Sequence, residues 1–313
     1  MKQINLKGAV PAAILPMNST YQPDFDHYEH YLKWLIDNGA IALAVNMDTG
    51  EGPQLTIEER LQVVQVAAKV AAGRATVMAG LMGATTEGAV SLAMAYKEAG
   101  ADGLVIFPNA SFRNDPLDVA ISYGYHKAIA EATDMPLMLF QLAPVFGGVL
   151  YTRDTLRKLL EIPQVTSIKE ASFDAQYYSY TIDTVRMCGR PITVLTGNDR
   201  FITESILLGA EGALLGFAAV GCPLVAKMLK LSNTGKLGEV AAMRNKVQRF
   251  AEVIYADPVL DYRARCKAAL AILGVIDRKL TFVRLPLLPT PDKDYPILQQ
   301  ALEEAGMFVY SQS

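Results

Sequence analysis

The chain has 313 residues, of which 51% are hydrophobic, so it can bury a large core as one or two domains. A formal net charge of −3 and the absence of any basic block argue against nucleic acid or an anionic membrane as a partner. No apolar run reaches the roughly 18 residues of a membrane span, and no signal-peptide pattern opens the chain. We therefore expect a cytoplasmic protein.

Short apolar runs, rich in β-branched residues, recur about every 25–30 residues, and a helical pattern follows each of them. Such runs are typical of parallel strands that are covered by helices on both faces. The predicted strands span residues 9–15, 41–46, 75–80, 103–107, 136–140, 165–169, 192–196 and 212–216.

Two of the helices between these strands carry clear boundary signals. Thr56 and Glu59 have the spacing of a capping box and predict a helix that stops at Gly73. Thr85 precedes a second helix, which ends at Gly100. Eight strand–helix units in order predict a closed (β/α)8 TIM barrel. The alternative is an open doubly wound sheet, which usually has a glycine-rich fingerprint after the first strand. Here residues 16–18 read Pro-Met-Asn at that position.

The pattern changes near residue 225, after which no strand is expected. Helical periodicity continues through residues 240–255, 259–273 and 295–305. No low-complexity linker separates this part from the rest. We therefore predict a barrel over residues 1–224 and a C-terminal helical extension, residues 225–313, that packs on it.

Lys169 is the sharpest candidate for catalysis. Active sites of such barrels lie at the carboxyl ends of the strands, and Lys169 ends the sixth strand. Partial burial disfavours the ammonium form and lowers the pKa of a lysine. A neutral amine can attack a carbonyl and form a Schiff base. The alternative is a lysine that extends from a strand end into solvent.

Other strand ends supply weaker candidates. After strand two, Asp48, Thr49 and Gly50 form a turn that could hold a carboxylate, although an ordinary turn has the same composition. Further candidates follow strands five and seven or end strand eight: Phe140, Gln141, Gly197, Asn198 and Leu214.

Histidines and cysteines give no sign of a metal centre. His27 and His30 fall on the predicted first helix and His126 on the fourth, so we expect surface or packing roles. Cys188, Cys222 and Cys266 lie far apart, which predicts buried free thiols in a reducing compartment. No cluster has metal-ligand spacing, and we expect no metal and no cofactor.

Over nearly its whole length the chain resembles the dihydrodipicolinate synthase / N-acetylneuraminate lyase family of class I Schiff-base aldolases, as a divergent member. Residues 47–51 (Met-Asp-Thr-Gly-Glu) are similar to the family's Gly-Thr-Thr-Gly-Glu turn, and residues 165–171 resemble its Schiff-base strand. Three further motifs match in order, at residues 197–199 (Gly-Asn-Asp), 211–216 (Glu-Gly-Ala-Leu-Leu-Gly) and 284–287 (Arg-Leu-Pro-Leu).

The resemblance implies a function and a set of roles. Family members bind pyruvate or another 2-oxo acid as an imine and then make or break a carbon–carbon bond, or eliminate water from a sugar acid. Lys169 would be the nucleophile, and Asp48 and Thr49, with the Gly50 backbone, would grip the carboxylate. Gly197 and Asn198 would line the mouth. Gln141 would hydrogen-bond the substrate, and a homodimer or homotetramer is expected.

Four departures from the family pattern argue against a true dihydrodipicolinate synthase. Phe140 stands where the family has a proton-shuttling tyrosine, and Asp48 replaces the first threonine of the turn. Phe146 stands near the position of an arginine for the second substrate, and residues 109–113 replace a tyrosine-bearing segment. These departures suggest a more apolar pocket, or an acid/base group from elsewhere, with Asp48, Asn198, Asp199 and a bound water as candidates.

The sequence thus favours a lyase or aldolase that acts on pyruvate or a related 2-oxo acid through Lys169. A sugar-acid dehydratase with the same lysine is the first alternative. The second is a barrel that has lost catalysis and binds a 2-oxo acid or another metabolite.

Overall fold

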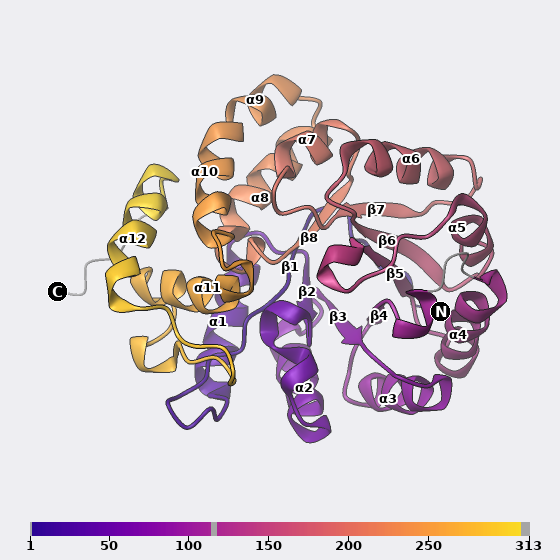
Figure 1. The fold of residues 1–313 in the computed structure, drawn as a ribbon, viewed down its shortest axis with the longest axis horizontal. Helices are drawn as coiled ribbons and strands as arrows, with labels where there is room; N and C mark the ends of the chain where they lie inside the picture. Colours follow the sequence, from indigo (N-terminus) through magenta and orange to yellow (C-terminus); the bar gives the residue numbers. More distant parts are fainter. Residues whose placement is uncertain (1, 114–117, 308–313) are drawn as a thin grey trace.

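The computed structural model describes residues 2–113 and 118–307 and contains one eight-stranded parallel sheet, whose strands follow the chain around the molecule (Figure 1). Each strand lies within about two residues of a predicted apolar run, except that the first is much shorter than expected. The strands are β1 (Ala9–Pro11), β2 (Ala42–Val45), β3 (Thr76–Leu81), β4 (Gly103–Ile106), β5 (Leu137–Leu142), β6 (Val165–Ala171), β7 (Thr193–Thr196) and β8 (Gly212–Leu215).

The sheet closes on itself, which confirms the predicted (β/α)8 barrel. β1 pairs in parallel with β8, and isolated bridges join the β1 segment to β2, between Ala9 and Ala40 and between Ala12 and Ala44. The chain beyond β1 keeps one of these contacts through a backbone hydrogen bond from Ala13 to the carbonyl of Ala44, at 2.9 Å. An open doubly wound sheet would instead have two edge strands and a strand order that reverses, such as 3-2-1-4-5-6.

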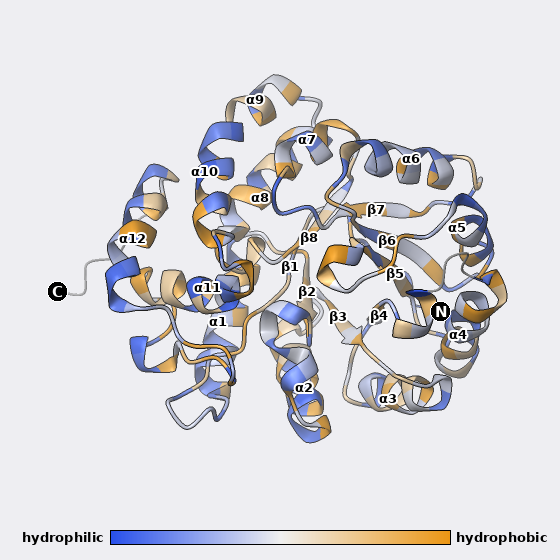
Figure 2. Ribbon diagram, in the orientation of Figure 1, coloured by the Kyte–Doolittle hydropathy of each residue, from blue (hydrophilic) through white to orange (hydrophobic). Residues whose placement is uncertain are grey.

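Alternate residues of the strands belong to two separate apolar clusters, because successive side chains of a strand point to opposite faces. A small inner cluster fills the barrel and includes Val10, Met138, Phe140 and Leu195. A much larger outer cluster joins the strands to the helices. The outer helices alternate hydrophilic and hydrophobic stretches, as expected for helices that bury one face (Figure 2).

The surrounding helices begin where the sequence signals indicate. Thr56 and Glu59 form both bonds of a capping box at the start of α2, and the Thr85 side chain caps α3. The eight helices that follow the strands are α1 (Phe25–Asp37), α2 (Ile57–Ala71), α3 (Thr86–Glu98), α4 (Val119–Thr133), α5 (Arg153–Leu159), α6 (Ala175–Arg186), α7 (Ile202–Leu207) and α8 (Ala218–Asn233).

The C-terminal part is helical, but its boundaries differ from the prediction. α8 crosses residue 224 and contacts both β1 and β8, so it is the eighth helix of the barrel, and we place the start of the extension after it. The predicted helix over residues 240–255 is two helices that meet at Met243. The extension comprises α9 (Leu237–Ala242), α10 (Arg244–Ile254), α11 (Tyr262–Ile272) and α12 (Tyr295–Glu304).

A buried ion pair joins this extension to the turn after β2. The Nζ atom of Lys267 in α11 lies 2.5 Å from Oε1 of Glu51, and both side chains are almost fully buried. Lys267 also donates to the carbonyl of Phe282 at 2.6 Å. The other oxygen of Glu51 accepts the backbone N–H of Arg284 at 2.6 Å. The extension therefore holds the strand-two turn in place.

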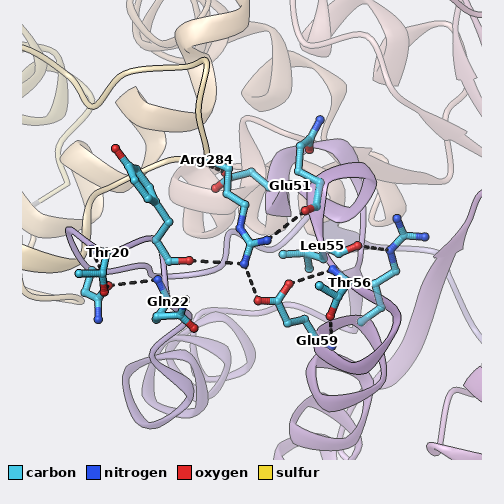
Figure 3. A network of polar contacts seen from close by, with 11 residues as sticks. Thr20, Gln22, Glu51, Leu55, Thr56, Glu59 and Arg284 are labelled. Atoms are coloured by element: carbon cyan, nitrogen blue, oxygen red, sulfur yellow. Dashed lines mark hydrogen bonds and ion pairs between the residues drawn. The ribbon is translucent and has the colours of Figure 1, made fainter.

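Arg284 extends this connection to helix α2 (Figure 3). Its guanidinium pairs with the carboxylate of Glu59 and donates to the carbonyl of Gln54 at 3.1 Å. The resemblance had marked residues 284–287 as a family signature. The contacts give Arg284 a structural role, because it binds the last residues of the turn to the helix that follows.

We expect Lys267→Met to lower the free energy of unfolding by about 3–5 kcal/mol, because it leaves the Glu51 carboxylate buried without its partner. Lys7→Met is the matched control, since Lys7 pairs with Glu211 on the surface, and it should cost less than about 1 kcal/mol. Urea unfolding followed by circular dichroism measures both. An equal decrease in the free energy of unfolding in the two variants would show that the buried pair contributes no more to stability than a surface pair.

Candidate active site

Lys169 and Phe140 face each other across neighbouring strands at the mouth of the barrel. The two residues are in register between β6 and β5, and the Lys169 Nζ atom lies 4.2 Å from the centroid of the Phe140 ring. The Phe107 ring packs edge-on against Phe140, with the centroids 5.0 Å apart. The amine thus lies at the top of an apolar barrel interior, against an aromatic wall.

This environment changes the titration of Lys169. Removal of the amine from water lowers its pKa to about 8, against the opposing effect of the Asp199 and Asp48 carboxylates. Desolvation is the larger effect because it penalises only the charged form. About a tenth of the Lys169 side chains are then neutral at pH 7, far more than for an ordinary lysine with a pKa of about 10.4. Only the neutral amine is a nucleophile.

Gly197 makes room for the lysine. A Cβ atom at this position would lie 2.7 Å from Cε of Lys169 and 2.9 Å from Cβ of Ala171. Any larger residue would therefore displace the lysine stem. The structure places Gly197 beside the stem of Lys169, and a contact of Gly197 with the substrate stays a prediction.

Asp199 is a buried carboxylate just after β7, and its charge acts on Lys169. It accepts the backbone N–H of Phe217 at 2.8 Å. Burial raises its pKa to about 6, opposed by that hydrogen bond, by the charge of Lys169 and by the hydroxyl of Tyr255. It is therefore mostly ionised at neutral pH but can take up a proton more readily than an exposed aspartate.

Asp48 is neutralised by the C-terminal extension. Its Oδ2 atom lies 2.6 Å from Nη2 of Arg263 and accepts the hydroxyl of Tyr262 at 2.9 Å. The Arg263 Nε–H also donates to the Asp48 carbonyl at 2.9 Å. An isolated Asp48 would repel a substrate carboxylate, and the paired Asp48 carries a compensating charge beside it.

Thr49 and Gly50 have different environments within the same turn. The Thr49 hydroxyl lies 3.3 Å from the hydroxyl of Tyr262, with either atom as the donor. The Gly50 N–H already donates to the Met47 carbonyl at 3.2 Å, so it does not offer the free anion donor that we predicted. Gly50 instead allows the turn to approach β1, because a Cβ there would lie 2.5 Å from the carbonyl oxygen of Ala13.

The positions of Gln141 and Asn198 differ from our prediction that both residues contact the substrate. Residues of a strand alternate, so Gln141 faces away from the barrel interior that holds Phe140, and it donates to the Thr181 hydroxyl of α6 at 2.7 Å. Asn198 is fully buried and donates to the Glu170 carboxylate at 2.7 Å. Both residues therefore hold Glu170 behind the sheet, where burial raises the pKa of that carboxyl to about 7.

Leu214 lies in the inner apolar cluster, in register with Val10, and is fully buried. It packs beneath the mouth in the same cluster as Phe140. A direct substrate contact by Leu214 stays a prediction.

The loop after β5 carries no charged group at the position of the missing arginine. Phe146 is 40% exposed and packs against the Phe173 ring, with the centroids 5.0 Å apart. Arg113, from the segment after β4, donates to the carbonyl of Gly147 in this loop. A guanidinium therefore reaches the loop from a different strand, where it binds backbone.

The remaining histidine and cysteine predictions concern packing. His126 is buried on α4 against the rings of Phe112 and Tyr125. Cys222 and Cys266 are buried free thiols, whereas Cys188 is partly exposed. Within residues 2–113 and 118–307, no group of histidine, cysteine or acidic side chains could hold a metal ion, and no helix is long and apolar enough to cross a membrane.

Sequence reasoning missed Tyr255, Tyr262 and Arg263, all of which come from the extension. They lie in a stretch where only helical periodicity was visible, so nothing in the local pattern placed them near Lys169. Their rings and charges reach the mouth because the segment between α10 and α11 packs over the ends of β2 and β8.

Comparisons with known proteins show which family and fold the chain shares. A 4-hydroxy-tetrahydrodipicolinate synthase of Neisseria meningitidis serogroup B is 29% identical over 302 residues, which cover 96% of this chain and 99% of the relative. An uncharacterized DapA-like lyase of Pyrobaculum islandicum is 27% identical and covers 97% of this chain and 100% of the relative. A chloride-inhibited dihydrodipicolinate synthase from Acinetobacter baumannii, solved in complex with pyruvate, is 27% identical with a TM-score of 0.84, over 97% of this chain and 100% of that one.

The model of the dihydrodipicolinate synthetase family matches residues 5–305, almost the whole chain. Identities below 30% to the relatives above agree with a divergent member. The chain belongs to the dihydrodipicolinate synthetase family, a family of lyases of the class I aldolase type.

Proposed function

We propose that the protein captures pyruvate or a related 2-oxo acid as an imine on Lys169 and then makes or breaks a carbon–carbon bond. The observation that carries this proposal is the partly neutral amine of Lys169, held against the Phe140 ring at the carboxyl end of β6. The pyruvate complex of the Acinetobacter baumannii relative supports the choice of ligand.

The strand-two turn would hold the carboxylate of the 2-oxo acid. Thr49 supplies a hydroxyl for this purpose. The Tyr262 hydroxyl lies 3.3 Å from it and donates its own proton to Asp48. Arg263 lowers the repulsion that the Asp48 carboxylate would otherwise exert on an anion. Gly50 acts indirectly, by allowing the turn to lie against β1.

The imine makes the next carbon reactive. Once the Lys169 nitrogen has replaced the carbonyl oxygen, the protonated C=N group draws electron density from the neighbouring C–C and C–H bonds. A carbanion at carbon three then becomes accessible and can add to a second carbonyl, or can form when a carbon–carbon bond breaks. The apolar wall of Phe107 and Phe140 keeps water from this centre.

We further propose that the second substrate is not that of a true dihydrodipicolinate synthase. Phe146 cannot form the bidentate, charge-assisted pair that an arginine makes with a carboxylate. The Arg113 guanidinium near this loop is bonded to the Gly147 carbonyl. The expected assembly as a homodimer or homotetramer and the cytoplasmic location stay predictions, which gel filtration and cell fractionation would test.

Pyruvate followed by borohydride should reduce the imine and attach a stable adduct to Lys169 and to no other lysine. Mass spectrometry of the digested protein would locate it. Lys169→Met should abolish the adduct, whereas Lys267→Met, which removes another buried lysine, should retain it wherever the variant folds. Wild-type protein without an adduct would contradict the imine and leave a non-catalytic binding barrel as the better account.

The rate of imine formation should rise with pH and level off above about pH 8, because the neutral amine of Lys169 becomes dominant as the pH passes its pKa of about 8. With an ordinary lysine the rate of imine formation would keep rising until the pH passed its pKa of about 10.4. Stopped-flow mixing with pyruvate at a series of pH values measures this profile. A rate that still climbs steeply above pH 9 would show that Lys169 is hydrated.

Turnover with pyruvate and aspartate semialdehyde should be negligible. A coupled assay for the cyclised product decides it, with an authentic dihydrodipicolinate synthase as the positive control. A Phe146→Arg variant should not lose imine formation and should gain some turnover if this position alone decides the second substrate. Wild-type turnover in the ordinary enzyme range of about 1–1000 s⁻¹ would show that the exclusion is wrong.

A further inference from the structure

Imine formation on Lys169 needs a group that moves protons, and the inner wall does not supply one. The ring that faces the amine is Phe140, which has no proton to transfer. The Gln141, Asn198 and Glu170 side chains lie together behind the sheet. The acid/base group must therefore reach the mouth from another part of the fold.

Two tyrosines of the C-terminal extension lie over this mouth. Tyr255 directly follows α10 and Tyr262 opens α11, and their rings stack with centroids 4.9 Å apart and an interplanar angle of 19°. The two residues lie at the facing ends of consecutive helices, so their relative position is fixed by ring stacking as well as by the backbone.

Gly216, at the end of β8, shows where the two phenols converge. A Cβ atom on Gly216 would lie 2.3 Å from the Tyr255 hydroxyl, 3.1 Å from Oγ1 of Thr49 and 3.2 Å from Cε2 of Tyr262. The Tyr255 hydroxyl therefore occupies the space that a side chain at residue 216 would fill. It points into the mouth of the barrel, beside the predicted carboxylate site.

The two phenols have different partners. The Tyr262 hydroxyl contacts Asp48 and Thr49 in the strand-two turn. It therefore belongs to the site that is predicted to bind the substrate carboxylate.

Asp199 accepts the backbone N–H of Phe217, the neighbour of Gly216, so its carboxylate lies on the same short stretch of backbone as the Tyr255 hydroxyl, and the two groups interact. The Asp199 carboxylate also interacts with the charge of Lys169. Asp48 also acts on the charge of Lys169, but its carboxylate is already paired with Arg263 and Tyr262. The Tyr255–Asp199 couple is therefore the better placed of the two connections to exchange protons with the amine.

We propose that Tyr255 and Asp199 together form the acid/base couple that replaces the missing strand-five tyrosine in imine formation on Lys169. The inference rests on the proposed function. It assigns the proton transfer to a residue of the C-terminal extension and makes that extension part of the active site.

The protons balance within the couple. The ammonium form of Lys169 has three protons, and two of them must leave with the carbonyl oxygen as water, so that R–NH₃⁺ and O=C give R–NH⁺=C and H₂O. Asp199 takes the first proton, after which the amine forms the C–N bond and the carbonyl π electrons move to oxygen. Tyr255 donates to that oxygen and is reprotonated by Asp199. A second transfer by the same route expels water as the C=N bond forms.

The test compares phenol deletions by the rate of imine formation. Tyr255→Phe removes only a hydroxyl, and positioned acid/base groups contribute about 10²–10⁴-fold to a rate. We expect pyruvate imine to form at least about 100-fold more slowly in Tyr255→Phe. The same Lys169 adduct should still accumulate on long incubation with borohydride, because the nucleophile is intact. Tyr178→Phe is the matched control, since that buried hydroxyl has no hydrogen-bond partner, and it should behave as wild type.

A rescue separates proton transfer from a structural effect. In the double variant Phe140→Tyr/Tyr255→Phe a phenol returns beside the amine, on the ring that lies 4.2 Å from Lys169 Nζ, and the rate should recover to within about tenfold of wild type. Asp199→Asn takes the place of Tyr255→Phe if the latter does not fold. An unchanged rate in Tyr255→Phe, or a slow rate that the new phenol does not restore, overturns the inference. Absence of any adduct in the wild type would instead overturn the proposed function.

Discussion

A lysine side chain that rises through the apolar interior of a barrel loses much of its hydration, and this loss favours the neutral amine. At Lys169 the loss outweighs two nearby carboxylates and brings the pKa to about 8. The aromatic ring of Phe140 shields one side of the amine from water, and Gly197 leaves the space that the lysine stem requires. The rest of the site is arranged around this amine. The Phe140 ring that faces the amine has no polar group that could bind a substrate or transfer protons. Another part of the fold must supply these groups.

The C-terminal extension supplies them. It is fixed to the turn after β2 by the buried pair of Glu51 and Lys267, so the turn and the helices form one structural unit. From this unit Arg263 neutralises Asp48, and the two stacked tyrosines reach the ends of β2 and β8. In the proposed function the barrel provides the nucleophile, whereas the extension provides charge compensation and phenols. This division explains how the site can lack a tyrosine at residue 140 and still hold hydroxyl groups at its mouth.

The fold and the position of Lys169 at a strand end were predictable because they depend on local signals. Apolar runs of strand length, a capping box at Thr56 and the position of Lys169 at a strand end are all visible in the sequence. Gln141 was misplaced because a strand end was treated as a whole, without the alternation that directs Phe140 inward and Gln141 outward. Tyr255 could not be found, because its place at Gly216 depends on how distant helices pack across the barrel, which no local pattern encodes.

The most direct test of this account is a crystal structure of the protein soaked with pyruvate. The account predicts continuous electron density between Nζ of Lys169 and carbon two of pyruvate, with the carboxylate at the Thr49 hydroxyl and the Tyr255 hydroxyl directed at the reacting carbon. Pyruvate bound without a covalent link, or covalently bound with its carboxylate away from the strand-two turn, would contradict it.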